Sequence, residues 1–194
     1  ETRHKKKDGT VIDVSVSTMP MKYGETQARI VLIQDITGRK QADEQLRKLA
    51  QAVEQSPESI VITNLASEIE YVNDAFIQST GYSREEALGQ NPRILQSGKT
   101  SPDVYGAMWN ALSKGQAWKG EFINRRKNGS EYIEFAIVTP MRQADGHITH
   151  FVAVKEDITL RKKAEEELRI QRAYFHQLFE NSPEAVVIVD GEER

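Results

Sequence analysis

Short runs of apolar and β-branched residues, separated by turn residues, predict five β-strands between residues 59 and 159. Two of these runs come first, "SIVITN" at 59–64 and "EIEYVN" at 68–73, joined by a tight connection. Three longer runs follow, at 118–127, 131–140 and 150–159. Asn-Gly and Asp-Gly pairs between those three are typical of hairpin turns, so we expect neighbouring antiparallel strands.

Between the two groups of strands the apolar spacing changes to that of helices. A short helix is predicted from Asp74 to a stop at Gly81, and a second is predicted between the capping box of Ser83 and Glu86 and Gly89. A longer helix is predicted over 101–115, with Ser101 before it and Gly115 after it. The order β-β-α-α-α-β-β-β predicts an α+β domain, with one antiparallel sheet and short helices on one face.

The strand at 131–140 is apolar on both faces. Tyr132, Ala136 and Val138 alternate onto one side, and Ile133, Phe135 and Ile137 alternate onto the other. Because a face of this kind is usually covered, we expect the predicted helices on one side and a flanking helix or a second subunit on the other.

Several motifs occur twice, about 120 residues apart. "KKDGT" ending at Thr10 returns as "RKNGS" ending at Ser130, "QDIT" returns as "EDIT", and "SPESIVITN" at 56–64 returns as "SPEAVVIVD" at 182–190. A period of this length is the size of a domain rather than of a solenoid repeat. We therefore expect the C-terminal part of a first unit at 1–38, a complete unit at 49–159 and the start of a further unit at 179–194.

The segments that connect these units, 39–54 and 160–178, are predicted to be charged linker helices. Seam positions recur at alternating steps of four and three, the pattern of a coiled coil, at Ala42, Leu46, Leu49 and Val53 and, with one polar member, at Ala164, Leu168, Gln171, Phe175 and Leu178. Acid-first pairs four residues apart support both helices: Asp43–Arg47, Glu44–Lys48 and Glu165–Arg169. The alternatives are a solvated connecting helix and a helix that pairs with its twin in a parallel homodimer.

Composition excludes several classes of function. The chain of 194 residues has 38% hydrophobic and 28% charged residues, as expected of folded domains. A net charge of −3 does not favour nucleic acid or an anionic membrane as a partner. With no cysteine, the chain has no disulfide, thiol nucleophile or cysteine metal site, and no catalytic constellation is visible. We expect a cytoplasmic protein segment, or the cytoplasmic part of a membrane-bound receptor, that has no catalysis of its own.

The motifs of residues 49–159 resemble those of a PAS domain with its C-terminal PAC segment. The matching stretches are "SPESIVITN", "YVNDAF", "TGYSREEALGQNPRIL", "WKGEFINRRKNG" and "KEDIT". The resemblance implies the PAS fold, with a five-stranded antiparallel sheet, and a sensory module of a bacterial signalling protein. It implies an output domain that is a histidine kinase or, alternatively, a diguanylate cyclase or phosphodiesterase. A rival hypothesis is a ligand-free dimerisation array.

In flavin-binding relatives an Asn just before a basic hairpin bonds the flavin ring, and the matching residue is Asn124. Trp118 lies on the same side of the strand, and Arg93 matches a residue placed to reach a ligand phosphate. The resemblance thus makes FAD, rather than FMN, one candidate; another small ligand and no cofactor are the alternatives. Trp118 as a core residue and Asn124 as a cap of its own hairpin are the structural alternatives.

The chain departs from photosensing relatives where it has Pro92 in place of Cys, Glu134 in place of Asn and Lys155 in place of Gln. Without a thiol no cysteinyl-flavin adduct can form. We expect Glu134 and Lys155 to face the same ligand pocket, where they could pair across adjacent strands and close a small, polar or empty cavity. Haem is disfavoured, because the haem-binding relatives use a His on the long helix and no His lies in 101–115.

The last strand runs directly into the charged helix after residue 159. Lys155 faces the predicted pocket, and Asp157 and Thr159 stand where strand becomes helix, with Thr159 as a candidate N-cap. The resemblance implies that this junction passes the signal onward, so Asp157 and Thr159 are predicted relay residues. The alternative is that they only end a strand and cap a helix.

Overall fold

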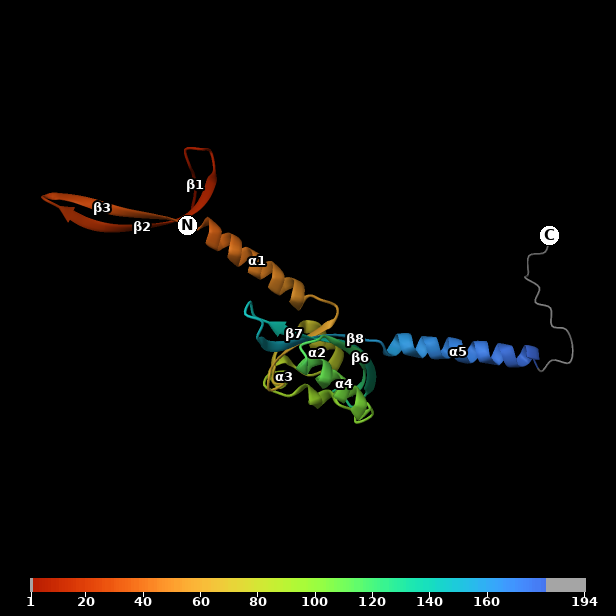
Figure 1. Ribbon diagram of the computed structural model, residues 1–194. Helices are drawn as coiled ribbons and strands as arrows, with labels where there is room; N and C mark the ends of the chain where they lie inside the picture. Colours follow the sequence, from red (N-terminus) through yellow and green to blue (C-terminus); the bar gives the residue numbers. More distant parts are fainter. Residues whose placement is uncertain (1, 181–194) are drawn as a thin grey trace, which may run out of the picture. The chain divides into compact units, whose positions relative to one another are not determined.

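A computed structural model describes residues 2–180 and divides the chain into two compact units, Glu1–Gln55 and Ser56–Arg194 (Figure 1). The predicted start of a further unit at 179–194 therefore falls almost wholly outside the described residues. Residues 49–54, which the sequence motifs assign to the complete unit, are here the last residues of a helix in the first unit.

The first unit is a three-stranded antiparallel sheet followed by a helix. Its strands are β1 (Thr2–Lys5), β2 (Val11–Tyr23) and β3 (Thr26–Asp35), in the order β1-β2-β3. Helix α1 (Thr37–Glu54) begins two residues after β3 ends. The long hairpin of β2 and β3 exposes apolar side chains such as Met19, Val31 and Ile33.

The second unit confirms the predicted order of elements. Strands β4 (Ser59–Asn64) and β5 (Ile69–Val72) precede helices α2 (Asp74–Thr80), α3 (Arg84–Ala87) and α4 (Pro102–Ser113). Strands β6 (Trp118–Arg125), β7 (Glu131–Arg142) and β8 (Ile148–Asp157) lead into helix α5 (Thr159–Glu180). The five strands form one antiparallel sheet in the order β5-β4-β8-β7-β6, so the fold is α+β as expected. A short 3-10 helix, η1 (Pro92–Leu95), was not predicted.

The helix boundaries follow from local side-chain chemistry. Ser83 and Glu86 form the predicted capping box of α3, and Gly81 ends α2 in the left-handed conformation that glycine adopts without strain. Asn73 begins α2 by accepting the amide of Phe76, and it also accepts the amide of Ile60 on β4 at 2.8 Å. The buried Asn73 side chain thus ties the first helix to the sheet.

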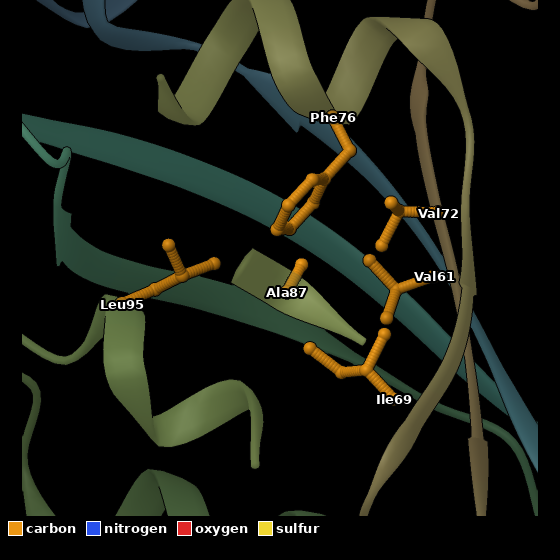
Figure 2. Packing of buried hydrophobic residues seen from close by; sticks show 6 residues of the cluster. All are labelled: Val61, Ile69, Val72, Phe76, Ala87 and Leu95. Carbon is orange, nitrogen blue, oxygen red and sulfur yellow. The ribbon is translucent and has the colours of Figure 1, made fainter. Parts of the chain in front are cut away.

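Helices α2 to α4 cover one face of the sheet, and the core lies between them (Figure 1). Figure 2 shows its central cluster, in which the ring of Phe76 points from α2 towards side chains of the strands and of α3. The cluster consists of Val61, Ile69, Val72, Phe76, Ala87 and Leu95. Each is at most 1% exposed, so every one of these side chains contributes its full apolar burial to stability.

The two faces of β7 differ more than the sequence suggests. Tyr132, Ala136 and Val138 are buried on the helix side, as predicted, whereas Ile137 on the other side is 42% exposed. The first turn of α5 reaches part of that outer face, where Lys162 lies 2.8 Å from Glu121. Ile133 and Phe135 on this face are half-buried, whereas Ile137 stays exposed among the described residues. The flanking helix thus covers part of the face, and cover of the rest by a second subunit remains a prediction.

The linker helices α1 and α5 are solvent-exposed and carry ion pairs between side chains of the same helix. Glu44 contacts Lys48 as predicted, but Asp43 pairs with Arg39, and Arg169 pairs with Glu166 rather than Glu165. Apolar residues such as Leu46, Leu49 and Leu168 are exposed along them. Between residues 2 and 180 we find no helix with the length and apolarity needed to cross a membrane.

Candidate functional site

A cavity of about 310 Å³ lies between the sheet and the segment from η1 to α4. Four aromatic side chains are among the residues that line it. Tyr105 of α4 stacks on Phe122 of β6 with ring centroids 5.4 Å apart, and Trp109 of α4 meets Phe151 of β8 edge-on at 6.1 Å. A cavity of this size, with aromatic walls and a few polar groups, is typical of a small-molecule site.

Asn124 lines this cavity and is 5% exposed. The loop after η1 holds the strand of Asn124 in place, because Thr100 Oγ1 accepts the amide of Ile123 at 2.8 Å and Gln96 forms a bridge to Asn124 itself. The Asn124 amide group donates to Glu134 at 3.3 Å. Asn124 therefore does not cap its hairpin; Asn128 does so by accepting the amide of Ser130.

Glu134 and Lys155 form the predicted pair across adjacent strands. The Lys155 ammonium lies 2.9 Å from the Glu134 carboxylate, and the two side chains are only 8% and 4% exposed. Lys155 lines the cavity, whereas Glu134 lies behind it. The Glu134 carboxylate pairs with the Lys155 ammonium and accepts hydrogen bonds from the Asn124 amide and the Tyr132 hydroxyl. The expectation that both charges face the pocket is thus correct only for Lys155.

Trp118 does not line the cavity, although it shares a side of β6 with Asn124. Its indole lies along the strand over Gly120 and packs on Phe122, with ring centroids 5.0 Å apart. A Cβ atom at Gly120 would stand 2.3 Å from this ring, so only glycine accommodates it. Trp118 therefore supports Phe122, a wall of the cavity, instead of meeting a ligand.

Arg93 lies at the rim of the cavity, on η1. Asn91 holds this short helix by accepting the amide of Arg93 at 3.1 Å. The guanidinium is exposed, so it can meet an anionic group of a ligand whose other end lies inside. Arg93 and Lys155 are the only charged residues among the lining of this cavity within the described chain, and both are cationic.

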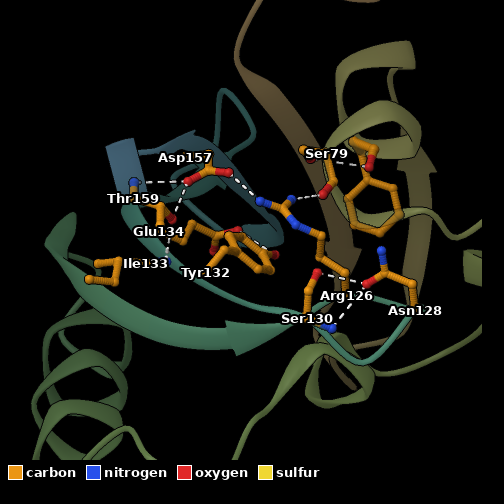
Figure 3. A network of polar contacts seen from close by, with 10 residues as sticks. Ser79, Arg126, Asn128, Ser130, Tyr132, Ile133, Glu134, Asp157 and Thr159 are labelled. Atoms are coloured by element: carbon orange, nitrogen blue, oxygen red, sulfur yellow. Dashed lines mark hydrogen bonds and ion pairs between the residues drawn. The ribbon is translucent and has the colours of Figure 1, made fainter. Parts of the chain in front are cut away.

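A network of polar contacts connects the floor of the cavity with the start of α5 (Figure 3). The Tyr132 hydroxyl donates to Glu134 at 3.1 Å, and burial together with the Glu134 charge raises its pKa, so it remains protonated. The guanidinium of Arg126 lies over the Tyr132 ring, 4.3 Å from its centroid, and pairs with Asp157 at 2.5 Å. Arg126 also donates to the carbonyl of Ser79, which joins the network to α2.

Asp157 and Thr159 hold the junction between β8 and α5. The Asp157 carboxylate accepts the amide of Thr159 at 2.9 Å, and Thr159 Oγ1 accepts the amide of Ile133 on β7 at 2.8 Å (Figure 3). Thr159 is the first residue of α5 and its hydroxyl faces β7, so the prediction that Thr159 is the N-cap is wrong. Asp157 binds the free amide at the helix start instead.

The pKa of Asp157 is lowered. Burial alone would raise it, but hydrogen bonds from Thr159 and Arg126 to the carboxylate outweigh burial and favour the ionised form. At neutral pH this residue is therefore a charged anchor for both the cation and the helix.

The first unit contains the same junction. Asp35 accepts the amide of Thr37 at 3.0 Å, Thr37 Oγ1 accepts the amide of Asp13 at 2.9 Å, and Lys6 pairs with Asp35 at 3.3 Å. These contacts match those of Asp157, Thr159, Ile133 and Arg126 one by one. The hairpin before β2 also matches, because Gly9 bonds to Lys6 as Gly129 bonds to Arg126.

Sequence reasoning missed Tyr132 and Arg126 as members of the site. The alternation of β7 places Tyr132 and Glu134 on one side, which would have indicated their proximity. The contact of Arg126 with Asp157 joins residues 31 positions apart, and only the fold brings them together. Metal binding has no support in residues 2–180, where no group of three or more His, Cys, Asp and Glu side chains could hold a metal ion.

Comparison with known proteins identifies the family of the second unit. The PAS domain family matches residues 57–160, and a second PAS domain match covers 173–194. The nitrogen fixation regulatory protein of Klebsiella oxytoca is 37% identical over 142 residues, which are 73% of this chain and 29% of that protein. The blue-light-activated histidine kinase of Brucella anthropi is 32% identical over 112 residues, covering 56% of this chain and 23% of the kinase.

Among solved structures, the LOV domain of the blue-light activated histidine kinase of Erythrobacter litoralis EL346 has a TM-score of 0.51. It is 29% identical, and the match covers 54% of this chain and 99% of that domain. This chain spans less than a third of the length of the Klebsiella regulator and of the Brucella kinase. With the family match over more than half of its residues, the chain belongs to the PAS family of sensory domains.

Proposed function

We propose that residues 57–160 sense a small ligand, a redox state or a cofactor change and relay it through α5 to an output domain. The observation that carries this proposal is the continuity of the site. Lys155 lines the cavity, and the contacts that begin at its ion pair with Glu134 end at Asp157 and the first amide of α5. A ligand that alters the Lys155 environment therefore acts within a few contacts of the helix start.

The ligand we propose first is a flavin, FAD rather than FMN. The aromatic walls fit a planar ring system, Asn124 offers an amide at its polar edge, and Arg93 stands at the rim for a phosphate. A bound flavin would supply redox or light chemistry, while the residues of the chain bind and orient it. The ion pair of Lys155 and Glu134 favours the rivals, another small ligand or an empty polar cavity, because it already satisfies both charges.

Spectroscopy of the purified chain tests the flavin. We expect flavin absorption bands in the protein as isolated, or saturable quenching of flavin fluorescence when FAD is added. Asn124→Ala should weaken FAD binding by about 1–3 kcal/mol, since it leaves polar ring atoms unpaired. Leu88→Ala, at an exposed residue outside the cavity, is the matched control. A colourless protein that takes up neither FAD nor FMN would remove the flavin from the proposal.

The wider organisation is also a proposal. The matching junctions support residues 1–38 as the C-terminal part of a first PAS/PAC domain, and the second family match supports a further PAS domain beginning near 179. The similarity to the Brucella histidine kinase favours a histidine kinase as the output domain, with a diguanylate cyclase or phosphodiesterase as the alternative. The segment itself would then be no enzyme.

We further propose that the linker helices pair in a parallel homodimer. Leu46, Leu49 and Val53 form an exposed row along α1, and Leu168 and Phe175 do so along α5. Rows of this spacing bury themselves against an identical helix in a coiled coil. A ligand-free dimerisation array, the rival function, would rest on these helices alone.

A further inference from the structure

Lys155 lies between two cavities. It lines the first, aromatic cavity and also a second one of about 350 Å³. Most residues that line the second cavity are polar or charged, and they include Ser59, Glu134 and Asp157. The ion pair of Lys155 with Glu134 therefore forms part of the partition between a ligand site and a chamber next to the start of α5.

The second cavity contains a polar group without a partner. The hydroxyl of Ser59 is buried and makes no hydrogen bond with any part of the chain that the structure describes, and the whole residue is 6% exposed. Buried hydroxyls are seldom left unsatisfied, because they lose their bonds to water on burial. Ser59 lies directly opposite Lys155 in the ladder of β4 and β8, so their side chains start close together.

Asp157 is the second group within reach of Lys155. The two residues are two positions apart on β8, and their side chains therefore lie on the same side of the strand. The flexible four-carbon stem of lysine can reorient its ammonium without moving the backbone. Glu134, the present partner, lies directly opposite Asp157 on β7, so the two carboxylates offer Lys155 neighbouring positions.

We propose that Lys155 is a two-position switch for the signal that leaves this domain, an inference that rests on the proposed sensory function. With the aromatic cavity free, its ammonium pairs with Glu134. A ligand that fills the cavity displaces the ammonium into the second cavity, where Ser59 Oγ and the Asp157 carboxylate accept it. Lys155 then competes with Arg126 and with the Thr159 amide for Asp157, and the first turn of α5 loosens.

The first unit has the same junction but lacks the charged pair, and this difference supports the role proposed for Lys155. The register of its strands places Val14 where the second unit has Glu134, opposite Asp35 as Glu134 is opposite Asp157. The same register places Ile33 at the position of Lys155. The junction contacts are the same in both units, so the helix can be held without the charged pair. The pair is therefore an addition to the junction and not a requirement for it.

Amide hydrogen exchange on the full chain, with no ligand, tests the switch. Glu134→Gln removes the charge that holds Lys155 but keeps the shape and an acceptor for Tyr132, so the ammonium should move to Asp157. We expect the amide of Thr159 to exchange about tenfold faster, because its acceptor is shared with a competing donor. Adding Lys155→Met should return the rate to that of the wild type, since no ammonium remains to compete.

The amide of Gly81, which bonds to Ile77 at the end of α2, is the internal control and should not change. A Ser59→Ala change in the Glu134→Gln background should lower the gain in exchange. Equal Thr159 rates in Glu134→Gln and Glu134→Gln/Lys155→Met, or rates that do not differ from the wild type, would overturn the switch.

If Glu134→Gln does not fold, Ala153→Leu takes its place, because Ala153 lines the aromatic cavity and its larger replacement mimics a ligand. Its effect on Thr159 should vanish in the Glu134→Val/Lys155→Ile background, which removes the ammonium without leaving a buried carboxylate unpaired, and persistence of the effect would contradict the proposal. No arm of this experiment uses a flavin. Failure of FAD binding therefore counts against the proposed cofactor alone, and unchanged exchange counts against the switch alone.

Discussion

Glu134 and Asp157 lie directly opposite each other on β7 and β8, so that two carboxylates face the same side of the sheet. Like charges in this arrangement destabilise a sheet unless cations compensate them. Lys155 compensates Glu134 at 2.9 Å and Arg126 compensates Asp157 at 2.5 Å. The four groups form a neutral cluster, and loss of any one leaves an uncompensated charge next to the start of α5.

Removing one partner of the Lys155–Glu134 ion pair should destabilise the fold strongly, whereas replacing both partners by apolar residues should change stability little. Lys155→Met alone, which leaves the buried Glu134 carboxylate without its cation, should lower the free energy of unfolding by about 3–5 kcal/mol. The double variant Glu134→Val/Lys155→Ile, which copies Val14 and Ile33 of the first unit, should be close to the wild type in stability. Urea denaturation followed by circular dichroism measures both. A double variant as unstable as the single one would refute the comparison between the units.

Asp157 should make stability depend on pH in a defined direction. Its pKa is lower in the folded chain than the ordinary 3.8, so the folded state binds the proton less readily than the unfolded state. The resulting stabilisation is fully present above the ordinary value and is lost as the pH falls through the lowered one. The difference in unfolding free energy between wild type and Asp157→Asn should therefore be largest near neutral pH and shrink in acid. A difference that grows below pH 3.8 would contradict this sign.

The same residue separates a relay from a structural role. In a protein with its output domain attached, Asp157→Ala should lock or abolish regulation while ligand affinity stays nearly intact. A loss of stability of about 1 kcal/mol, typical of a missing helix cap, with normal regulation would show that the junction is only structural. Output activity with and without ligand, measured beside thermal unfolding, distinguishes the two results.

Gly120→Ala should displace Trp118. The added Cβ would stand 2.3 Å from the indole, so the ring must leave Phe122, at a cost of about 1–3 kcal/mol. A red shift of Trp118 emission in a Trp109→Phe background reports the movement. Gly106→Ala on α4 is the matched control, since its Cβ would meet no atom within 4 Å, and it should stabilise the helix by about 0.5–1 kcal/mol. Unchanged emission in Gly120→Ala would show that the Trp118 indole does not lie over Gly120.

The linker helices should govern self-association. Leu46→Lys and Leu168→Lys each put a charge into an apolar row and should shift the chain from dimer to monomer in sedimentation experiments. Gln51→Lys adds the same charge to α1 on the side away from the row and should leave association unchanged. A wild-type chain that sediments as a monomer at high concentration would exclude the dimer for this segment.

The sequence by itself determined the elements and the face that most side chains take. Local chemistry sets these features: Gly81 ends α2, and the capping box of Ser83 and Glu86 begins α3, through contacts within a few residues of the chain. Strand alternation likewise places Tyr132 and Ala136 on the buried side of β7. The pairing of Glu134 with Lys155 could also be predicted, because adjacent strands bring such residues within reach.

Only the tertiary structure decided which of these groups meet across the fold. Alternation places Trp118 and Asn124 on one side of β6, but the absence of a side chain at Gly120 lets the indole lie flat on the strand, away from the cavity. The contact of Arg126 with Asp157 and the second cavity behind Lys155 depend on the packing of β6, β8 and α2, which are far apart in the chain. Such contacts follow from the order of strands in the sheet, and no local pattern of residues encodes that order by itself.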